Sequence, residues 1–113
     1  WLETPKTEEE LAQQAGTEAA AYPNNVTSNA YGMDEAAEIV SEAGVQAEWD
    51  DTVKQNYAQW EADGGVYKIW LEGNQSLEEK LKVIKSNSLA GVAEWSLGME
   101  NSSVWDLILQ YVN

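Results

Sequence analysis

Hydrophobic residues between positions 45 and 71 alternate with polar ones. Three runs of such alternation are separated by short polar turns, and Asp63, Gly64 and Gly65 supply the positive-φ residues that a tight hairpin needs. The pattern predicts an antiparallel meander of three strands, over residues 45–49, 55–61 and 66–71.

A helix is predicted before this meander, over residues 33–43. Asp34 and Glu35 lie near its positive N-terminal end, and Gly44 is a typical residue just beyond a helix C-terminus. Its apolar stripe comprises Ala37, Ile39, Val40 and Ala43.

After residue 71 the apolar residues recur every three to four positions, which predicts a helix from Ser76. Ser76 and Glu79 have the spacing of a capping box, and Glu78 with Lys82 that of a favourable pair one turn apart. The predicted apolar stripe is Leu77, Leu81, Val83, Ile84 and Leu89.

The apolar run Leu89–Trp95 is short, as a buried parallel strand would be, and a helix is predicted from Asn101 to Asn113. Its buried face comprises Val104, Leu107, Ile108 and Tyr111, and its spacing favours Trp105 as a core residue. The order strand, helix, strand, helix implies right-handed crossovers in a parallel sheet. Two strands cannot form that sheet alone, so the chain lacks the neighbours for which they are built.

Residues 1–32 carry less pattern. Thr7 and Glu10 can form a capping box at the start of a short helix, and residues 22–32 predict a loop with one short extended stretch. The first residue is Trp1 rather than Met, so we expect an excised or processed piece of a longer protein.

The composition excludes several classes of partner and cofactor. A net charge of −14 argues against nucleic acid and anionic membranes as partners. The chain has no Cys and no His, so we expect no disulfide, no metal site and no other cofactor. No apolar run is long enough to span a membrane. The six Trp and five Tyr, without Phe, suit sugar surfaces as well as protein cores.

The second half of the chain resembles glycoside hydrolase family 18, the chitinase-like family, and especially its bacterial branch acting on cell-wall or spore glycans. The resemblance rests on an aromatic strand ending in an acid (Tyr67–Glu72), a Ser-Leu helix start with a later Lys (Ser76, Leu77, Lys80), an aliphatic strand ending in Trp (Leu89–Trp95), and "SVWDLI" in the final helix.

The resemblance implies an α/β fold, namely the C-terminal part of a (β/α)₈ TIM barrel. Residues 66–113 would be its last two strand–helix units, residues 33–65 a small α+β insertion containing the meander, and residues 1–32 a loop segment after the sixth strand.

The chain departs from the family where the chemistry lies. The motif Asp-x-x-Asp-x-Asp-x-Glu, whose final Glu is the family's general acid, is absent. The resemblance therefore implies a glycosidase as the parent, and a fragment that carries no catalytic residue and is inactive alone. The parent reaction would be hydrolysis beside N-acetylglucosamine with the substrate's acetamido oxygen as nucleophile.

Trp95 is the principal candidate for glycan binding. The resemblance implies that it forms the floor of the sugar site, and its place at the C-terminal end of a predicted barrel strand agrees, although a core role stays open. Glu72 is a second candidate, as a sugar ligand or as a charge near the next helix. Trp1 is a weaker one. Possible cleft-lining residues are Trp49, Tyr57 and Trp60.

Two functions of different classes stay open. The first is the C-terminal part of a hydrolase of N-acetylglucosamine-containing glycan such as chitin or peptidoglycan, outside the cell or in the wall of a Gram-positive-like bacterium. Its partners would be the glycan and the rest of the barrel. The second is a non-catalytic interaction module that completes its sheet by self-association, because unpaired strand edges invite pairing. A solvated domain without a ligand is a third, plainer alternative.

Overall fold

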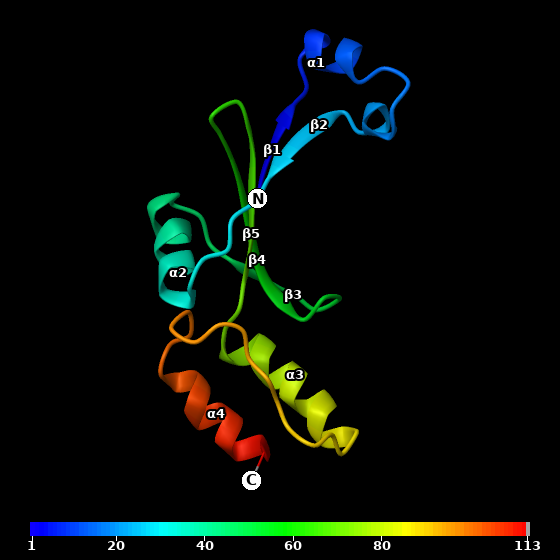
Figure 1. The fold of residues 1–113 in the computed structure, drawn as a ribbon. Coiled ribbons are helices and arrows are strands. Elements are labelled where there is room, and N and C mark those ends of the chain that lie inside the picture. Colours follow the sequence, from blue (N-terminus) through cyan, green and yellow to red (C-terminus); the bar gives the residue numbers. More distant parts are fainter. Residues whose placement is uncertain (113) are drawn as a thin grey trace. The chain divides into compact units, whose positions relative to one another are not determined.

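The computed structural model describes residues 1–112 and divides them into two compact units. Residues 1–30 and 59–69 form the first unit, and residues 31–58 together with those from 70 onward form the second. The sheet contains five strands in the order β2-β1-β5-β4-β3 (Figure 1). Every pairing whose register is known in this sheet is antiparallel.

The first unit contains more regular structure than the sequence predicts. Its elements are β1 (Leu2–Pro5), α1 (Glu8–Gln13), the 3₁₀ helix η1 (Glu18–Ala21) and β2 (Asn24–Thr27). Strand β1 pairs with β2, with Leu2 opposite Thr27, and also with β5, with Leu2 opposite Tyr67. The short helix and the short extended stretch predicted within residues 1–32 are confirmed as α1 and β2. Strand β1 was not predicted, because a strand of four residues is too short to display an alternating pattern.

The predicted capping box of α1 is confirmed. The Thr7 hydroxyl accepts a hydrogen bond from the Glu10 backbone N–H at 3.2 Å, and the Glu10 carboxylate accepts one from the Thr7 backbone N–H at 2.8 Å. The second of these bonds lowers the pKa of Glu10.

The meander is confirmed with small shifts of its boundaries. Its strands are β3 (Glu48–Asp50), β4 (Gln55–Ala62) and β5 (Gly65–Leu71), and β3 pairs antiparallel with β4. Asp63 and Gly64 both have positive φ, 53° and 75°, as a two-residue turn of the primed type requires. Gly65 is needed for another reason: a Cβ there would lie 2.2 Å from the carbonyl oxygen of Glu3 in β1.

Helix α2 (Met33–Glu42) confirms the predicted helix and its end, because Gly44 has a φ of 70°. Its buried residues are Ala36 and Val40, whereas Ala37 is exposed. The predicted stripe is confirmed at Val40 and, as partly buried positions, at Ile39 and Ala43. It is wrong at Ala37, because Ala36 faces the core and its neighbour lies about 100° further around the helix.

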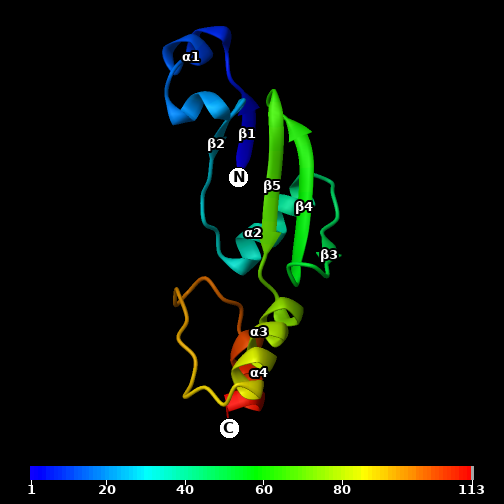
Figure 2. The ribbon, with the colours of Figure 1, turned by 90° about the vertical axis from the view of Figure 1, so that its right-hand side faces the viewer.

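The core of the second unit lies between α3 (Asn74–Ser86) and α4 (Ser103–Val112). These helices lie side by side and run in the same direction, and the segment 87–101 returns between their ends (Figures 1 and 2). The predicted buried face of α4 is confirmed. The buried core residues are Leu81, Val104 and Ile108, surrounded by the partly buried Met33, Leu77, Ile84, Leu107 and Tyr111.

The start of α3 corrects the predicted capping box. The N-cap is Gly73, and Ser76 is the third helical residue, fully buried, whose hydroxyl accepts a hydrogen bond from the Gly73 N–H at 2.9 Å. Glu79 pairs with Lys82 at 2.7 Å, and Glu78 instead accepts a hydrogen bond from the Tyr111 hydroxyl. The helix thus begins two residues before Ser76, and the Ser76 hydroxyl accepts a hydrogen bond from the N-cap residue from within the first turn.

Three further predictions in this unit are wrong. The run Leu89–Trp95 forms no strand, because within residues 1–112 no other strand pairs with it. Val83 and Leu89 are 58% and 55% exposed and do not extend the α3 stripe. Trp105 is 42% exposed and lies beside the buried face of α4, not within it. Residue 113, which ends the predicted last helix, lies outside the described residues.

The chain is therefore a small mixed α/β protein with an antiparallel sheet. None of the helices among residues 1–112 combines the length and the apolar character needed to cross a membrane.

Candidate functional site

Trp95 lies in the segment 87–101, which connects α3 to α4. The segment begins where Ser88 adopts a left-handed conformation, with φ 52°, and Leu89 donates a backbone hydrogen bond to the Ile84 carbonyl at 3.1 Å. Residues 89–95 are all exposed, and Trp95 is 97% exposed. Its indole is therefore available to a ligand or a partner, and a core role within this chain is wrong.

The chain after Trp95 is held more firmly than the chain before it. Met99 donates a backbone hydrogen bond to the Ser96 carbonyl at 3.1 Å, and Gly98 takes a φ of 94°. The Glu100 carboxylate accepts one hydrogen bond from the Gly98 N–H at 2.7 Å and another from the Trp105 indole N–H at 3.3 Å. Trp95 thus extends from a turn that is fastened to the start of α4.

Glu72 follows β5 directly, and its carboxylate contacts side chains in the first two turns of α3. It accepts a hydrogen bond from the Ser76 hydroxyl at 2.5 Å and forms an ion pair with Lys80. These contacts favour the simpler of the two roles considered for Glu72, that of a charge stabilising the start of a helix.

Trp1 and Trp60 lie in the first unit. The Trp1 indole N–H donates to the Glu3 carboxylate at 3.0 Å, which together with Lys68 lowers the pKa of Glu3. The Trp60 ring stacks on Tyr67 with centroids 5.3 Å apart, and the Tyr67 hydroxyl donates to Asp63 at 2.8 Å. Trp60 therefore packs against its hairpin neighbour.

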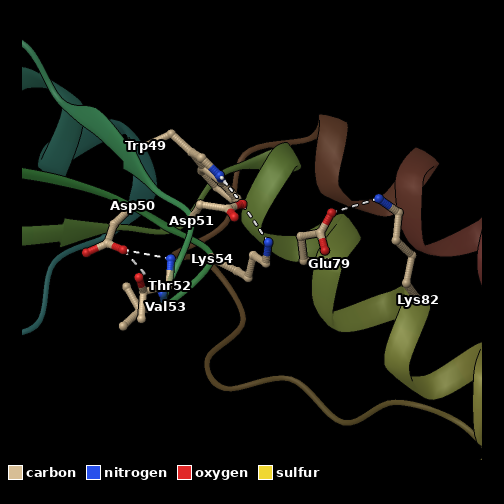
Figure 3. Close-up of polar contacts among 8 residues, drawn as sticks. All are labelled: Trp49, Asp50, Asp51, Thr52, Val53, Lys54, Glu79 and Lys82. Carbon is tan, nitrogen blue, oxygen red and sulfur yellow. Dashed lines mark hydrogen bonds and ion pairs between the residues drawn. The ribbon is translucent and has the colours of Figure 1, made fainter.

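Tyr57 and Trp49 lie in the second unit. Tyr57 contacts Trp70 with ring centroids 5.1 Å apart and a tilt of 50°. The Trp49 indole N–H donates to Asp51 at 3.4 Å, and Asp51 also pairs with Lys54, in a turn that Figure 3 shows in detail. Tyr57 and Trp60 are three positions apart in β4, and this odd spacing places them on opposite faces of a strand. The predicted cleft-lining residues thus do not form one aromatic wall.

A shallow depression of about 480 Å³ lies in the first unit. It is lined by Glu3, Pro5, Asn24, Glu61, Ala62, Gly64, Gly65 and Val66. None of the predicted site residues lines it, and within residues 1–112 no group of three or more acidic side chains is arranged to hold a metal ion. The strongest candidate for binding therefore stays the exposed indole of Trp95.

Two residues that hold the turn next to this indole were not singled out from the sequence. Glu100 follows Trp95 by five positions and was not considered, and Trp105 was assigned to the core. Their hydrogen bond joins a turn to a helix. No helical or strand period signals such a contact, so only the folded chain reveals it.

Comparison with known proteins places this arrangement in context. No family model matches the chain. The cortical fragment-lytic enzyme of Bacillus subtilis is 24% identical over 80 residues, which are 70% of this chain and 19% of that enzyme.

Two solved structures share the fold. The spore cortex-lytic enzyme SleL of Bacillus megaterium matches 99% of this chain over 23% of its own, with a TM-score of 0.69 and 19% identity. A chitinase from Chromobacterium violaceum matches 70% of this chain over 25% of its own, with a TM-score of 0.62 and 22% identity. The chain thus spans about a fifth to a quarter of the length of these relatives. It is a mixed α/β chain whose fold is shared with part of chitinase and spore cortex-lytic enzymes.

Proposed function

We propose that the chain is the C-terminal part of a family 18 glycoside hydrolase that acts on N-acetylglucosamine-containing glycan. In this proposal it supplies part of the cleft, lacks the catalytic acid and is inactive alone. The observation that carries the proposal is the fold shared with two glycan-lytic enzymes over most of this chain but only a quarter of theirs. The names of those enzymes, cortex-lytic enzyme and chitinase, favour a wall or spore glycan and action outside the cell.

The arrangement of α3, the segment 87–101 and α4 supports a place in a barrel. Two helices that run side by side in one direction need a return between them, and in a (β/α)₈ barrel that return is a strand. Residues 89–95 occupy this position and are apolar, but have no strand beside them within residues 1–112. We propose that the rest of the barrel supplies the neighbours that would convert them into a strand. Residues 66–113 then make the last two units and residues 33–65 the insertion.

Trp95 is the proposed contact with the glycan. A free indole face matches the apolar face of a pyranose ring, and the C-terminal ends of barrel strands carry the active sites of that fold. Glu72 follows the preceding strand and is retained as a second contact. Trp1, Trp49, Tyr57 and Trp60 are retained as cleft-lining candidates of lower rank, because each already contacts a neighbour.

An assay of the isolated chain tests the proposal. Incubated with chitooligosaccharides or with cortex peptidoglycan fragments, it should release no product. Added glycan should nevertheless shift the tryptophan fluorescence of the wild-type chain and of Trp70→Ala, but not of Trp95→Ala. Measurable hydrolysis by the chain alone, or an unchanged glycan response in Trp95→Ala, would contradict the proposal.

A chimera tests the barrel assignment. This chain replaces its aligned segment in the Bacillus subtilis cortical fragment-lytic enzyme, and lysis of cortex fragments is measured. Activity should be retained with Trp95 and lost in Trp95→Ala. If the chimera does not fold, as judged by circular dichroism, the fluorescence experiment with the isolated chain decides instead.

A second function is favoured by one observation, the exposed apolar residues of the 89–97 segment. Trp95 is 97% and Leu97 83% exposed, which is unusual for residues of this size. An assembly module would cover them by self-association and complete its sheet. Light scattering after size exclusion distinguishes the two: a dimer or larger species without any glycan response supports assembly, and a monomer excludes it.

A further inference from the structure

The indole of Trp95 has little to orient it except the backbone that carries it. No strand is formed before it, and with 97% of the residue exposed the side chain has almost no packing. A stacking residue is effective only if its face is held in one direction, because ordering a free side chain on binding costs conformational entropy. The orientation of the indole therefore depends on the contacts that hold the backbone next to Trp95.

The turn that follows Trp95 is closed by a single carboxylate. Glu100 accepts from the Gly98 N–H at 2.7 Å with one oxygen and from the Trp105 indole N–H at 3.3 Å with the other. The first bond spans the turn in which Gly98 takes a φ of 94°, and the second reaches α4. One side chain thus joins the turn to a helix whose neighbouring face is buried in the core.

A second fastening lies one residue away. The Met99 carbonyl accepts a hydrogen bond from the Met33 N–H at 2.7 Å, and the Asn101 N–H contacts the Met33 sulfur at 3.4 Å. Gly32 packs closely on this segment, since a Cβ there would lie 3.2 Å from the Met99 carbonyl oxygen, a tight contact. The backbone around Glu100 is therefore held to the start of α2, so that Glu100 acts from a fixed position.

Glu100 is ionised in this environment. The hydrogen bond from its own backbone N–H, followed by those from Gly98 and Trp105, lowers its pKa. Hydrogen bonds to an ionised acceptor are shorter and stronger than those between neutral groups. The carboxylate is thus a stronger hydrogen-bond acceptor for the Gly98 and Trp105 N–H groups than a neutral amide of the same size.

We infer that Glu100 is a positioning residue, which holds the turn after Trp95 on the start of α4 and so sets the direction of the indole for a sugar ring. This inference rests on the proposed function, because it assigns a role relative to a glycan. Glu100 itself does not touch the glycan; it acts through the backbone of residues 96–98.

Glu100→Gln is the test variant, and Glu94→Gln is its matched control. Glutamine keeps the size but offers one oxygen, so one of the two N–H groups loses its acceptor. Glu94 precedes Trp95 and is exposed, and its replacement removes the same charge. Binding of chitopentaose is measured by NMR, hydrogen exchange of the Gly98 amide by the same method, and stability by urea unfolding.

Glu100→Gln should weaken chitopentaose binding and speed exchange at Gly98, each about fivefold, as expected for one lost hydrogen bond. Glu94→Gln should change neither. Trp105→Phe removes the indole N–H donor but keeps an aromatic side chain, and should give a smaller effect in the same direction. A purely structural role predicts a loss of stability with unchanged binding; that result, or unchanged exchange at Gly98, overturns the inference.

The outcome stays separable from the proposed function. If the wild-type chain shows no glycan response, the proposed function fails. The positioning role is then judged by the Trp95 resonance in protein labelled with 5-fluorotryptophan and assigned with Trp95→Phe. That resonance should shift or broaden in Glu100→Gln and keep its linewidth in Glu94→Gln, and an unaltered resonance in Glu100→Gln rejects the inference.

Discussion

Strand β5 and the segment 89–95 are both seven residues long, and the sequence predicts a strand in each. In the structure β5 lies between β1 and β4, whereas residues 89–95 form no strand and are exposed. A run of this length therefore becomes a strand only when another strand is there to pair with it.

Local geometry explains which run finds a partner. The turn at Asp63 and Gly64 brings β4 to β5 after two residues, so that pairing needs almost no loop closure. The segment 89–95 has helices on both sides, and a strand between helices depends on partners from distant parts of a chain. Pairs of substitutions, one in a packed element and one in this segment, test whether the two regions differ in their contribution to stability.

The largest difference is expected between two leucines. Leu81→Ala leaves a cavity in the α3–α4 core and should lower the free energy of unfolding by about 2–5 kcal/mol. Leu89→Ala, in the exposed segment, should change it by less than about 0.5 kcal/mol. Urea unfolding followed by circular dichroism measures both. Equal losses would mean that the segment is packed in solution.

Two glycines provide the next comparison. Gly65→Ala places a methyl group 2.2 Å from the Glu3 carbonyl oxygen and should destabilise the chain by about 1–3 kcal/mol, with loss of the β1 pairing. Gly91→Ala meets nothing within 4 Å and should be neutral or slightly stabilising. Thermal unfolding and amide exchange in β1 measure the contrast, and a tolerated Gly65→Ala would contradict the close approach of the two strands.

Two tryptophans should differ by a smaller amount. Trp70→Ala removes the ring contact with Tyr57 and should cost about 1 kcal/mol. Trp95→Ala should leave stability within about 0.5 kcal/mol. The same unfolding experiment compares them. A large loss in Trp95→Ala would show that its indole is buried in a contact between molecules.

The smallest change in stability is expected from the carboxylate of Glu3 in β1. The hydrogen bond from Trp1 and the ion pair with Lys68 lower the pKa of Glu3 from 4.5. A carboxyl group whose pKa is lowered in the folded state stabilises the fold at pH values above its pKa in the unfolded chain. This contribution is lost as the pH falls through the pKa of the folded state. Glu3→Gln should therefore be slightly less stable than the wild type at neutral pH and equal to it in strong acid. Glu94→Gln serves as the control, and a stability difference that persists in acid would contradict this role.

Much of the local structure could be predicted from particular residues. Thr7 with Glu10, Asp63 with Gly64, and the buried face of α4 are set by neighbours within a few positions, and each prediction is confirmed. Strand β1 could not be predicted, because four residues carry too little pattern and β1 is stabilised by β5, more than sixty positions away. Strand β2 lies where one short extended stretch was predicted.

The candidate site was predicted in part. Trp95 is a candidate because of its residue type and its place in the chain, but its exposure could not be predicted from either. The hydrogen bonds of Glu100 to Gly98 and Trp105 depend on how a turn meets a helix, which no repeat in the sequence encodes.

By itself, the sequence determined the helices, the hairpin and the acidic, cysteine-free surface, because propensity, capping and turn chemistry act over a few residues. Only the tertiary structure decided that one apolar run became a central strand and the other an exposed carrier of Trp95. Backbone N–H and C=O groups in a strand are satisfied by another strand, and whether that strand is present is a property of the assembled fold.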